Sequence, residues 1–191
     1  VFLHFGSISG YARIYVNGQQ VGMTKASKTP AEFNVTNYLK EGENLLAVQI
    51  YRWHDGSYME DQDFWRLTGI ERDVFLQAYP KLTIWDFFLK SSLDSTYKNG
   101  IFNATVDLRE FTGNNVKKGT LKLELLDKTG KIVLSQQKKF NVEEEFTRLA
   151  FSGVIKNVFK WNAEKPSLYD CVITLWDDKN KQLAVTACKT G

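Results

Sequence analysis

Short apolar runs separated by turn residues dominate the chain, and several of them alternate apolar with polar positions, as half-buried β-strands do. The clearest hairpin is ARIYVNGQQVG, in which Asn17 and Gly18 stand between β-branched and aromatic residues, a pattern typical of a type I′ turn. Similar punctuation recurs at LLDKTGKIVL and VITLWDDKNKQLAV. No long segment has a 3.6-residue period, although TPAEFNVTNYLKEGEN leaves room for a short turn of helix. An all-β architecture is therefore predicted.

The balance of charged residues changes near Pro80, where one strand-like run ends and another begins, and this predicts two domains, 1–79 and 80–191. Residues 1–80 contain 7 Lys and Arg against 9 Asp and Glu, whereas residues 81–191 contain 18 against 13. The second half has about seven strand-like runs at the spacing of an immunoglobulin-like β-sandwich. It lacks the Cys…Trp…Cys pattern of true immunoglobulin domains, so only the architecture is predicted there.

The first half has fewer convincing strands than a closed jelly roll, which needs about eight. They are VFLHFGSI, ARIYVNG, QQVGMTK, NLLAVQIYRW and ERDVFLQAY. We therefore expect a partial jelly-roll sandwich whose sheets expose edges that upstream strands would cover. The sequence also starts without methionine inside an apolar run, which favours a piece of a longer protein.

The composition of the chain excludes some classes of binding partner but says little about its chemistry. With 191 residues, 43% of them hydrophobic, the chain can bury one large or two modest cores. No run is long enough for a membrane span, and the lysines of the second half alternate with acids, so neither a membrane nor a nucleic acid is an expected partner. His4 and His54 stand alone, without zinc spacing.

Two cysteines flank the last predicted hairpin. Cys171 and Cys188 could face each other, although a one-residue bulge is expected to separate them. Whether they are bonded stays open, and one pair does not decide between compartments. In the segment before them, WNAEKPSLYD, we expect Trp161 and Tyr169 to pack into the core of the sandwich.

The segment RWHDGSYMEDQDFWRLTG, residues 52–69, is too long for a simple hairpin and is typical of functional loops. It combines four carboxylates with four aromatic rings: Asp55, Glu60, Asp61 and Asp63, and Trp53, Tyr58, Phe64 and Trp65. Sugar hydroxyls need charged acceptors, and the C–H faces of a pyranose need a ring beneath them. A buried hydroxyl without a partner costs about 1–3 kcal/mol, so one carboxylate can select between epimers.

Three other interpretations of this loop stay open on the residues alone. The acids can form a structural ion-pair network with Arg52, Arg66 and Arg72 under a Trp-rich lid. A calcium site in EDQD fits poorly, because the spacing differs from an EF-hand and the segment supplies too few ligands. A glycosidase pair needs two carboxyls about 5 Å apart for retention, and no sequence spacing sets that distance.

The loop and its surroundings carry a family resemblance. The run from VNGQQVG through RWHDGSYMEDQDFWRLTGIERDVFL resembles the sugar-binding jelly-roll domain of glycoside hydrolase family 2 β-galactosidases. Downstream, KWNAEKPSLYDCVITL resembles the end of their immunoglobulin-like second domain. The similarity covers essentially the whole chain, and is weakest over residues 81–155, where only strand rhythm and length agree.

The resemblance implies a fragment of a retaining β-galactosidase that hydrolyses terminal β-D-galactosyl residues. In this family a (β/α)8 barrel follows and carries two catalytic glutamates, so the fragment has no catalytic residue and is expected to be inactive alone. The loop sequence favours galactosidase over the related β-glucuronidases and β-mannosidases. The expected partners are a β-galactoside substrate, the missing barrel, the upstream strands and further copies in a homo-oligomer. Localisation stays open between cytoplasm and periplasm.

The resemblance also assigns roles within the loop. Asp63, the last acid of EDQD, is implied to bind substrate and to ligate a monovalent cation, sodium, whose other ligands belong to the barrel. Magnesium is a further cation implied for the parent enzyme. No cofactor is expected in the fragment. The other loop residues are expected to be structural. The rings are expected to pack, and the arginines to pair with Glu60, Asp61 or Asp73. These structural residues are Trp53, Tyr58, Glu60, Asp61, Trp65, Arg66 and Arg72. The competing hypotheses are a non-catalytic carbohydrate-binding module with an immunoglobulin-like spacer, and a purely structural pair of β-domains.

Overall fold

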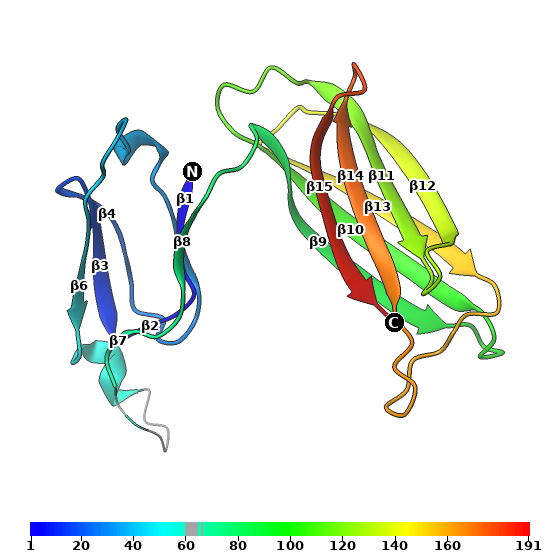
Figure 1. Ribbon diagram of the computed structural model, residues 1–191, viewed down its shortest axis with the longest axis horizontal. Coiled ribbons are helices and arrows are strands. Elements are labelled where there is room, and N and C mark those ends of the chain that lie inside the picture. The colour runs from blue at the N-terminus through cyan, green and yellow to red at the C-terminus, as the bar shows by residue number, and fades with distance from the viewer. Residues whose placement is uncertain (60–64, 66) are drawn as a thin grey trace. The chain divides into compact units, whose positions relative to one another are not determined.

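The computed structural model describes residues 1–59, 65 and 67–191, and it divides the chain into two compact units, Val1–Ala78 and Tyr79–Gly191. Both units are built from β-strands, as Figure 1 shows, and the all-β prediction is confirmed. The helical structure that is described amounts to two short 3-10 turns, η1 (Thr36–Tyr38) and η2 (Asp55–Tyr58). No helix among the described residues is long and apolar enough to cross a membrane.

The described residues of the first unit form two three-stranded antiparallel sheets, with strand orders β5-β1-β8 and β4-β3-β6, and a short β2-β7 pair. Its strands are β1 (Phe2–Phe5), β2 (Ile8–Ser9), β3 (Tyr11–Val16), β4 (Gln19–Thr24), β5 (Ala31–Asn34), β6 (Leu46–Tyr51), β7 (Gly69–Ile70) and β8 (Val74–Gln77). Successive side chains of a strand point to opposite faces of its sheet, so each central strand buries the side chains of one face. The core of this unit is made of Leu3, Phe5, Ile8, Ala12, Ile14, Val16 and Val35.

The predicted Asn-Gly hairpin is confirmed. Val16 pairs with Gln19, which leaves a two-residue turn in which Asn17 has φ of 51° and Gly18 has φ of 81°. Both values are positive, as a type I′ turn requires. The short helical turn is confirmed as η1, but strand β5, which precedes it, was not recognised in the sequence.

Two edge strands of the first unit expose apolar side chains. Strands β6 and β8 each end a sheet in the part of the chain that the structure describes. Leu46 on β6 is 40% exposed, and Phe75 and Leu76 on β8 are 45% and 58% exposed. Open sheet edges were expected from the small number of strands, and the described strands show them.

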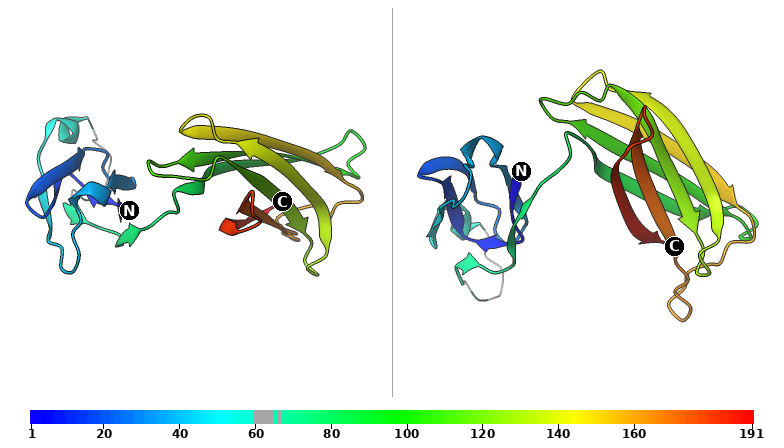
Figure 2. Two further views of the ribbon diagram at one scale, coloured as in Figure 1. Left: turned by 90° about the horizontal axis from the view of Figure 1, so that it is seen from above. Right: turned by 45° about the horizontal axis from the view of Figure 1, so that its top comes forward.

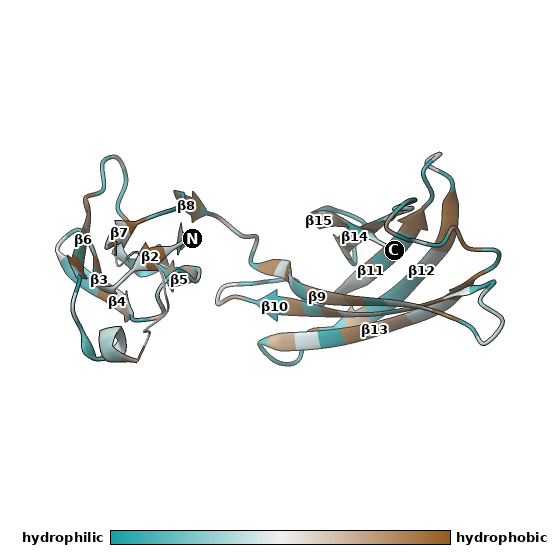
Figure 3. Cartoon of the chain, turned by 90° about the horizontal axis from the view of Figure 1, so that it is seen from below, coloured by the Kyte–Doolittle hydropathy of each residue, from teal (hydrophilic) through white to brown (hydrophobic). Residues whose placement is uncertain are grey.

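The second unit is a sandwich of two antiparallel sheets, ordered β13-β10-β9 and β12-β11-β14-β15 (Figure 2). The strands are β9 (Leu82–Leu93), β10 (Gly100–Glu110), β11 (Lys118–Leu126), β12 (Ile132–Asn141), β13 (Phe146–Ile155), β14 (Tyr169–Asp177) and β15 (Gln182–Thr190). Hydrophobic and hydrophilic bands alternate along β10 and β13 in Figure 3, as expected for strands that bury one face. The seven strands match the predicted sandwich.

Two expectations for the second unit need correction. Tyr169 is buried and its hydroxyl accepts a hydrogen bond from the Phe159 N–H at 2.8 Å, but Trp161 is 55% exposed. Trp161 lies outside the sheets, in a loop closed by the bridge to Pro166, so the sandwich covers only part of its side chain. The second correction concerns the hairpin of β14 and β15: its bulge lies at Leu175 and Trp176, and does not separate the cysteines.

Candidate functional site

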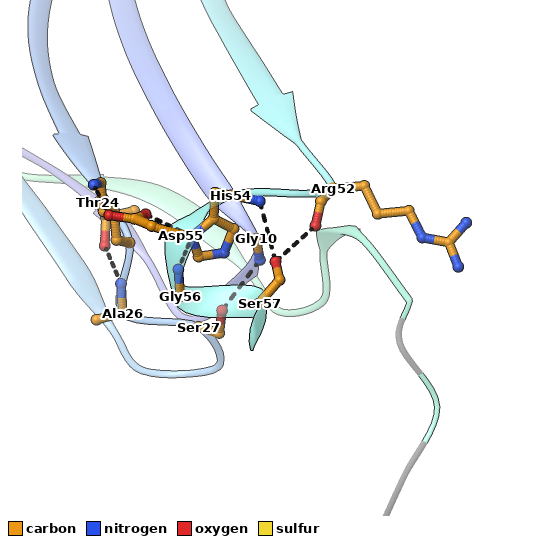
Figure 4. Close-up of polar contacts among 10 residues, drawn as sticks. Gly10, Thr24, Ala26, Ser27, Arg52, His54, Asp55, Gly56 and Ser57 are labelled. Atoms are coloured by element: carbon orange, nitrogen blue, oxygen red, sulfur yellow. Dashed lines mark hydrogen bonds and ion pairs between the residues drawn. The ribbon is translucent and has the colours of Figure 1, made fainter. Parts of the chain in front are cut away.

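The candidate site is the base of the 52–69 loop, where β6 ends and the short turn η2 begins (Figure 4). His54 caps this turn: its Nδ1 accepts the Gly56 N–H at 3.2 Å, and its own backbone N–H donates to Ser57 Oγ at 3.2 Å. Ser57 in turn donates to the Arg52 carbonyl at 3.3 Å. These reciprocal bonds satisfy the backbone groups that a helical turn leaves unpaired, and they hold residues 52–57 in one conformation.

Asp55 is held by a lysine from another strand. Lys25, just after β4, contacts Asp55 Oδ2 at 2.8 Å, and this hydrogen bond lowers the pKa of the Asp55 carboxyl, with help from the Gly56 N–H. Asp55 Oδ1 also lies 3.4 Å from His54 Nδ1, but that nitrogen already accepts a backbone N–H and cannot donate as well. Sequence reasoning offered arginines as partners for the loop acids; at Asp55 the partner is a lysine.

An aromatic and cationic cluster supports the loop from the outer face of β3. Tyr11 and Tyr51 pair across β3 and β6 and stack with centroids 5.4 Å apart. Arg13 lies 5.5 Å from the Tyr11 ring and donates to its hydroxyl at 2.7 Å, and Lys25 lies 5.7 Å from the same ring. Sequence reasoning missed this cluster. The available signal was the outward alternation of Tyr11, Arg13 and Tyr15 along β3.

Gly10 is required where the chain turns into β3. Its φ is +102°, and a Cβ built there would lie 2.6 Å from the carbonyl oxygen of Tyr51. Its N–H donates to Ser27 Oγ at 3.3 Å. A side chain at this position would therefore displace the end of β6, from which the loop starts.

The aromatic rings of the loop were expected to pack against the protein, but those in the described residues are exposed. Trp53 is 57% exposed, Tyr58 82% and Trp65 84%, so these rings do not pack inside the described chain. Arg52 lies 5.2 Å from the Trp53 ring, and its side chain extends away from the capped turn in Figure 4. Trp53 and Tyr58, which stand next to or within the capped turn η2, thus present aromatic faces to solvent.

Most of the predicted acids fall outside the described residues, namely Glu60, Asp61 and Asp63, and so does Arg66. Arg72 and Asp73 are described, and no ion pair joins them within that part of the chain. The backbone carbonyl of Asp73 accepts a hydrogen bond from the Gly6 N–H at 2.9 Å. Nearby, Glu71 contacts Lys28 at 3.3 Å and accepts from Ser7 Oγ at 3.4 Å, which fixes the chain where it returns from the loop.

The described residues contain no group of three or more His, Cys, Asp or Glu side chains that could hold a metal ion. Binding of sodium or magnesium by this part of the protein stays a prediction. What the described residues do provide is a rigid, hydrogen-bonded base below exposed rings. That arrangement suits binding of a ligand with C–H faces and hydroxyls.

Comparison with known proteins gives a consistent result over the whole chain. The family described as "Glycosyl hydrolases family 2, sugar binding domain" matches residues 1–80, and "Glycosyl hydrolases family 2" matches residues 82–191. A β-galactosidase of Priestia megaterium is 37% identical over 193 residues, covering 100% of this chain and 19% of that protein. A β-galactosidase of Streptococcus thermophilus is 38% identical over 191 residues, covering 100% of this chain and 18% of that protein.

Solved structures agree in fold. The crystal structure of a β-glucuronidase from Bacteroides uniformis aligns with 100% of this chain and 24% of its own, at a TM-score of 0.86 and 22% identity. At that identity the likeness shows the fold alone. The chain spans about a fifth of the length of the curated relatives it matches.

Proposed function

Because the chain belongs to family 2 of the glycosyl hydrolases, we propose that it is the sugar-binding and immunoglobulin-like part of a retaining β-galactosidase. The complete enzyme hydrolyses terminal β-D-galactosyl residues by a double displacement, with the two carboxyls of that reaction supplied by a further domain. This chain contributes a scaffold and a substrate-contacting loop, and it is inactive alone.

One observation carries the choice of galactosidase. Relatives named β-galactosidase are 37% and 38% identical to this chain over its whole length. Similarity at this level along the whole chain supports a galactoside as the substrate of the complete protein. The complete protein should accordingly turn over an aryl β-D-galactoside much faster than the matching glucuronide or mannoside. Preference for the glucuronide would overturn the galactosidase assignment.

Within the loop, Asp63 is proposed to contact the galactosyl hydroxyls and a sodium ion. The support is its position in EDQD, the segment of strongest family resemblance. Asp63→Asn in the complete enzyme should raise the KM for the galactoside and weaken its sodium dependence, because the amide retains the shape but not the charge. Asp55→Asn is the matched control, since Lys25 already holds that carboxylate. Equal effects of the two substitutions would argue against a special role for Asp63.

A second candidate function, a carbohydrate-binding module, is favoured by the exposed rings of the loop. The 191-residue chain should then bind galactose by itself, which a titration followed by amide NMR in sodium and in potassium buffer measures. Trp53→Ala should abolish binding, whereas Trp161→Ala removes an equally exposed tryptophan, 55% against 57%, from the other unit. No binding by the native chain would exclude the module hypothesis, and binding retained by Trp53→Ala would exclude this ring as part of the binding site.

A further inference from the structure

The hairpin of β14 and β15 brings the two cysteines of the chain together. Cys171 pairs directly with Cys188 across the antiparallel ladder, and both thiols are free. We propose that this pair is a thiol–disulfide modification site: Cys188 exchanges with a small disulfide such as oxidised glutathione, and Cys171 resolves the adduct into a disulfide that links β15 to β14.

The backbone already has suitable geometry for this bond. Directly opposed residues of an antiparallel pair have Cα atoms about 4.5–5.5 Å apart, inside the range of about 4.4–6.8 Å found for disulfides. Opposed side chains also share one face of the sheet. The bulge at Leu175 and Trp176 leaves the register from Tyr169 to Leu175 unbroken, so no slip separates the two sulfurs.

Burial assigns different roles to the two thiols. Cys171 is fully buried in the core, whereas Cys188 is only partly buried and lies on β15, one of the two edge strands of its sheet. Burial raises the pKa of Cys171 to about 12, and the contact with Cys188 adds to that shift. Burial also raises the pKa of Cys188, but there the hydrogen bond with Cys171 acts in the opposite direction. The thiolate that begins exchange therefore forms at Cys188.

The exchange is balanced in atoms and electrons. The Cys188 thiolate attacks one sulfur of oxidised glutathione, the glutathione S–S bond breaks, and one glutathione leaves and takes up a proton. Cys171 then releases its proton and attacks Cys188 Sγ, and the second glutathione leaves in the same way. Two protein thiols are oxidised and one glutathione disulfide is reduced.

The product closes a loop of 16 residues between the cysteines. In the reduced chain, β15 is held by its ladder to β14, by the exposed Lys189–Asp170 pair at 2.8 Å, and by the Ser91–Thr190 hydrogen bond at 2.9 Å. A covalent link removes conformational freedom from the unfolded hairpin, so the oxidised chain is expected to be more stable than the reduced one.

The test uses the 191-residue chain in buffers of graded oxidised and reduced glutathione, quenched by alkylation and followed by intact mass. The native chain should lose two hydrogens without keeping glutathione, and non-reducing digestion should yield one linked peptide containing Cys171 and Cys188. The urea midpoint should rise on oxidation. A lasting glutathione adduct, or two thiols that stay open to alkylation under full oxidation, would overturn the proposal.

Single variants separate the two roles. Cys171→Ala should keep a glutathione adduct at Cys188, because no second thiol can resolve it, and its urea midpoint should gain nothing from oxidation. Cys188→Ala removes a small, partly buried side chain, and it should take up no glutathione, because the remaining thiol is buried. Modification of Cys171 in that variant would contradict the assigned order of attack.

Discussion

Replacing Gly10 with alanine tests how the start of β3 holds the base of the loop. Gly10 has φ of +102°, and an added Cβ would lie 2.6 Å from the Tyr51 carbonyl oxygen. An unfavourable backbone conformation costs about 1–3 kcal/mol, and a forced close approach adds about 1–3 kcal/mol. We expect Gly10→Ala to lower the free energy of unfolding by about 2–6 kcal/mol in total. That is a large part of the roughly 5–15 kcal/mol of an ordinary domain.

Gly18→Ala is the matched control, because Gly18 also has a positive φ, +81°, but no atom lies within 4 Å of its added Cβ. It should lose only the backbone part of the penalty, about 1–3 kcal/mol. Urea unfolding followed by circular dichroism gives both values, and amide NMR shows whether residues 51–57 shift in Gly10→Ala alone. Equal losses in the two variants would refute the argument that Gly10 permits a close approach to β6.

Three further predictions concern charge and packing. The pKa of Asp94 is lowered from 3.8 to about 2, first by the Thr96 hydroxyl and then by Asn99, so its stabilisation is complete above pH 3.8 and fades as the pH falls towards 2. Asp94→Asn should remove this part of the acid unfolding curve, and an unchanged curve would contradict the assignment. Lys25→Met should raise the pKa of Asp55 towards its ordinary value, as carboxyl NMR would show; a constant pKa would exclude Lys25 as the main cause. Leu123→Ala, at a fully buried site, should cost about 2–5 kcal/mol of unfolding free energy, whereas Val185→Ala, 56% exposed, should cost under about 0.5 kcal/mol; similar costs in urea unfolding would show that burial does not decide the effect.

Much of the candidate site depended on contacts between residues far apart in the chain. The resemblance located the loop and its family, and the family is confirmed. It could not reveal that Lys25 holds Asp55, since the two residues are brought together only when β4 and η2 meet. Nor could it place Trp53 and Trp65, whose exposure depends on how far the sheets extend around them. The role of Asp63 stays a prediction.

The sequence by itself determined the all-β class, the Asn17-Gly18 turn and the family, because period-two alternation, a turn that needs positive φ and a run of motif residues are all local properties. Only the tertiary structure decided which residues oppose each other: Tyr11 with Tyr51, and Cys171 with Cys188. The physical reason is register. A shift of one residue between strands changes every cross-strand pair while leaving the pattern along each strand intact, so pairing is settled by the packing of whole strands.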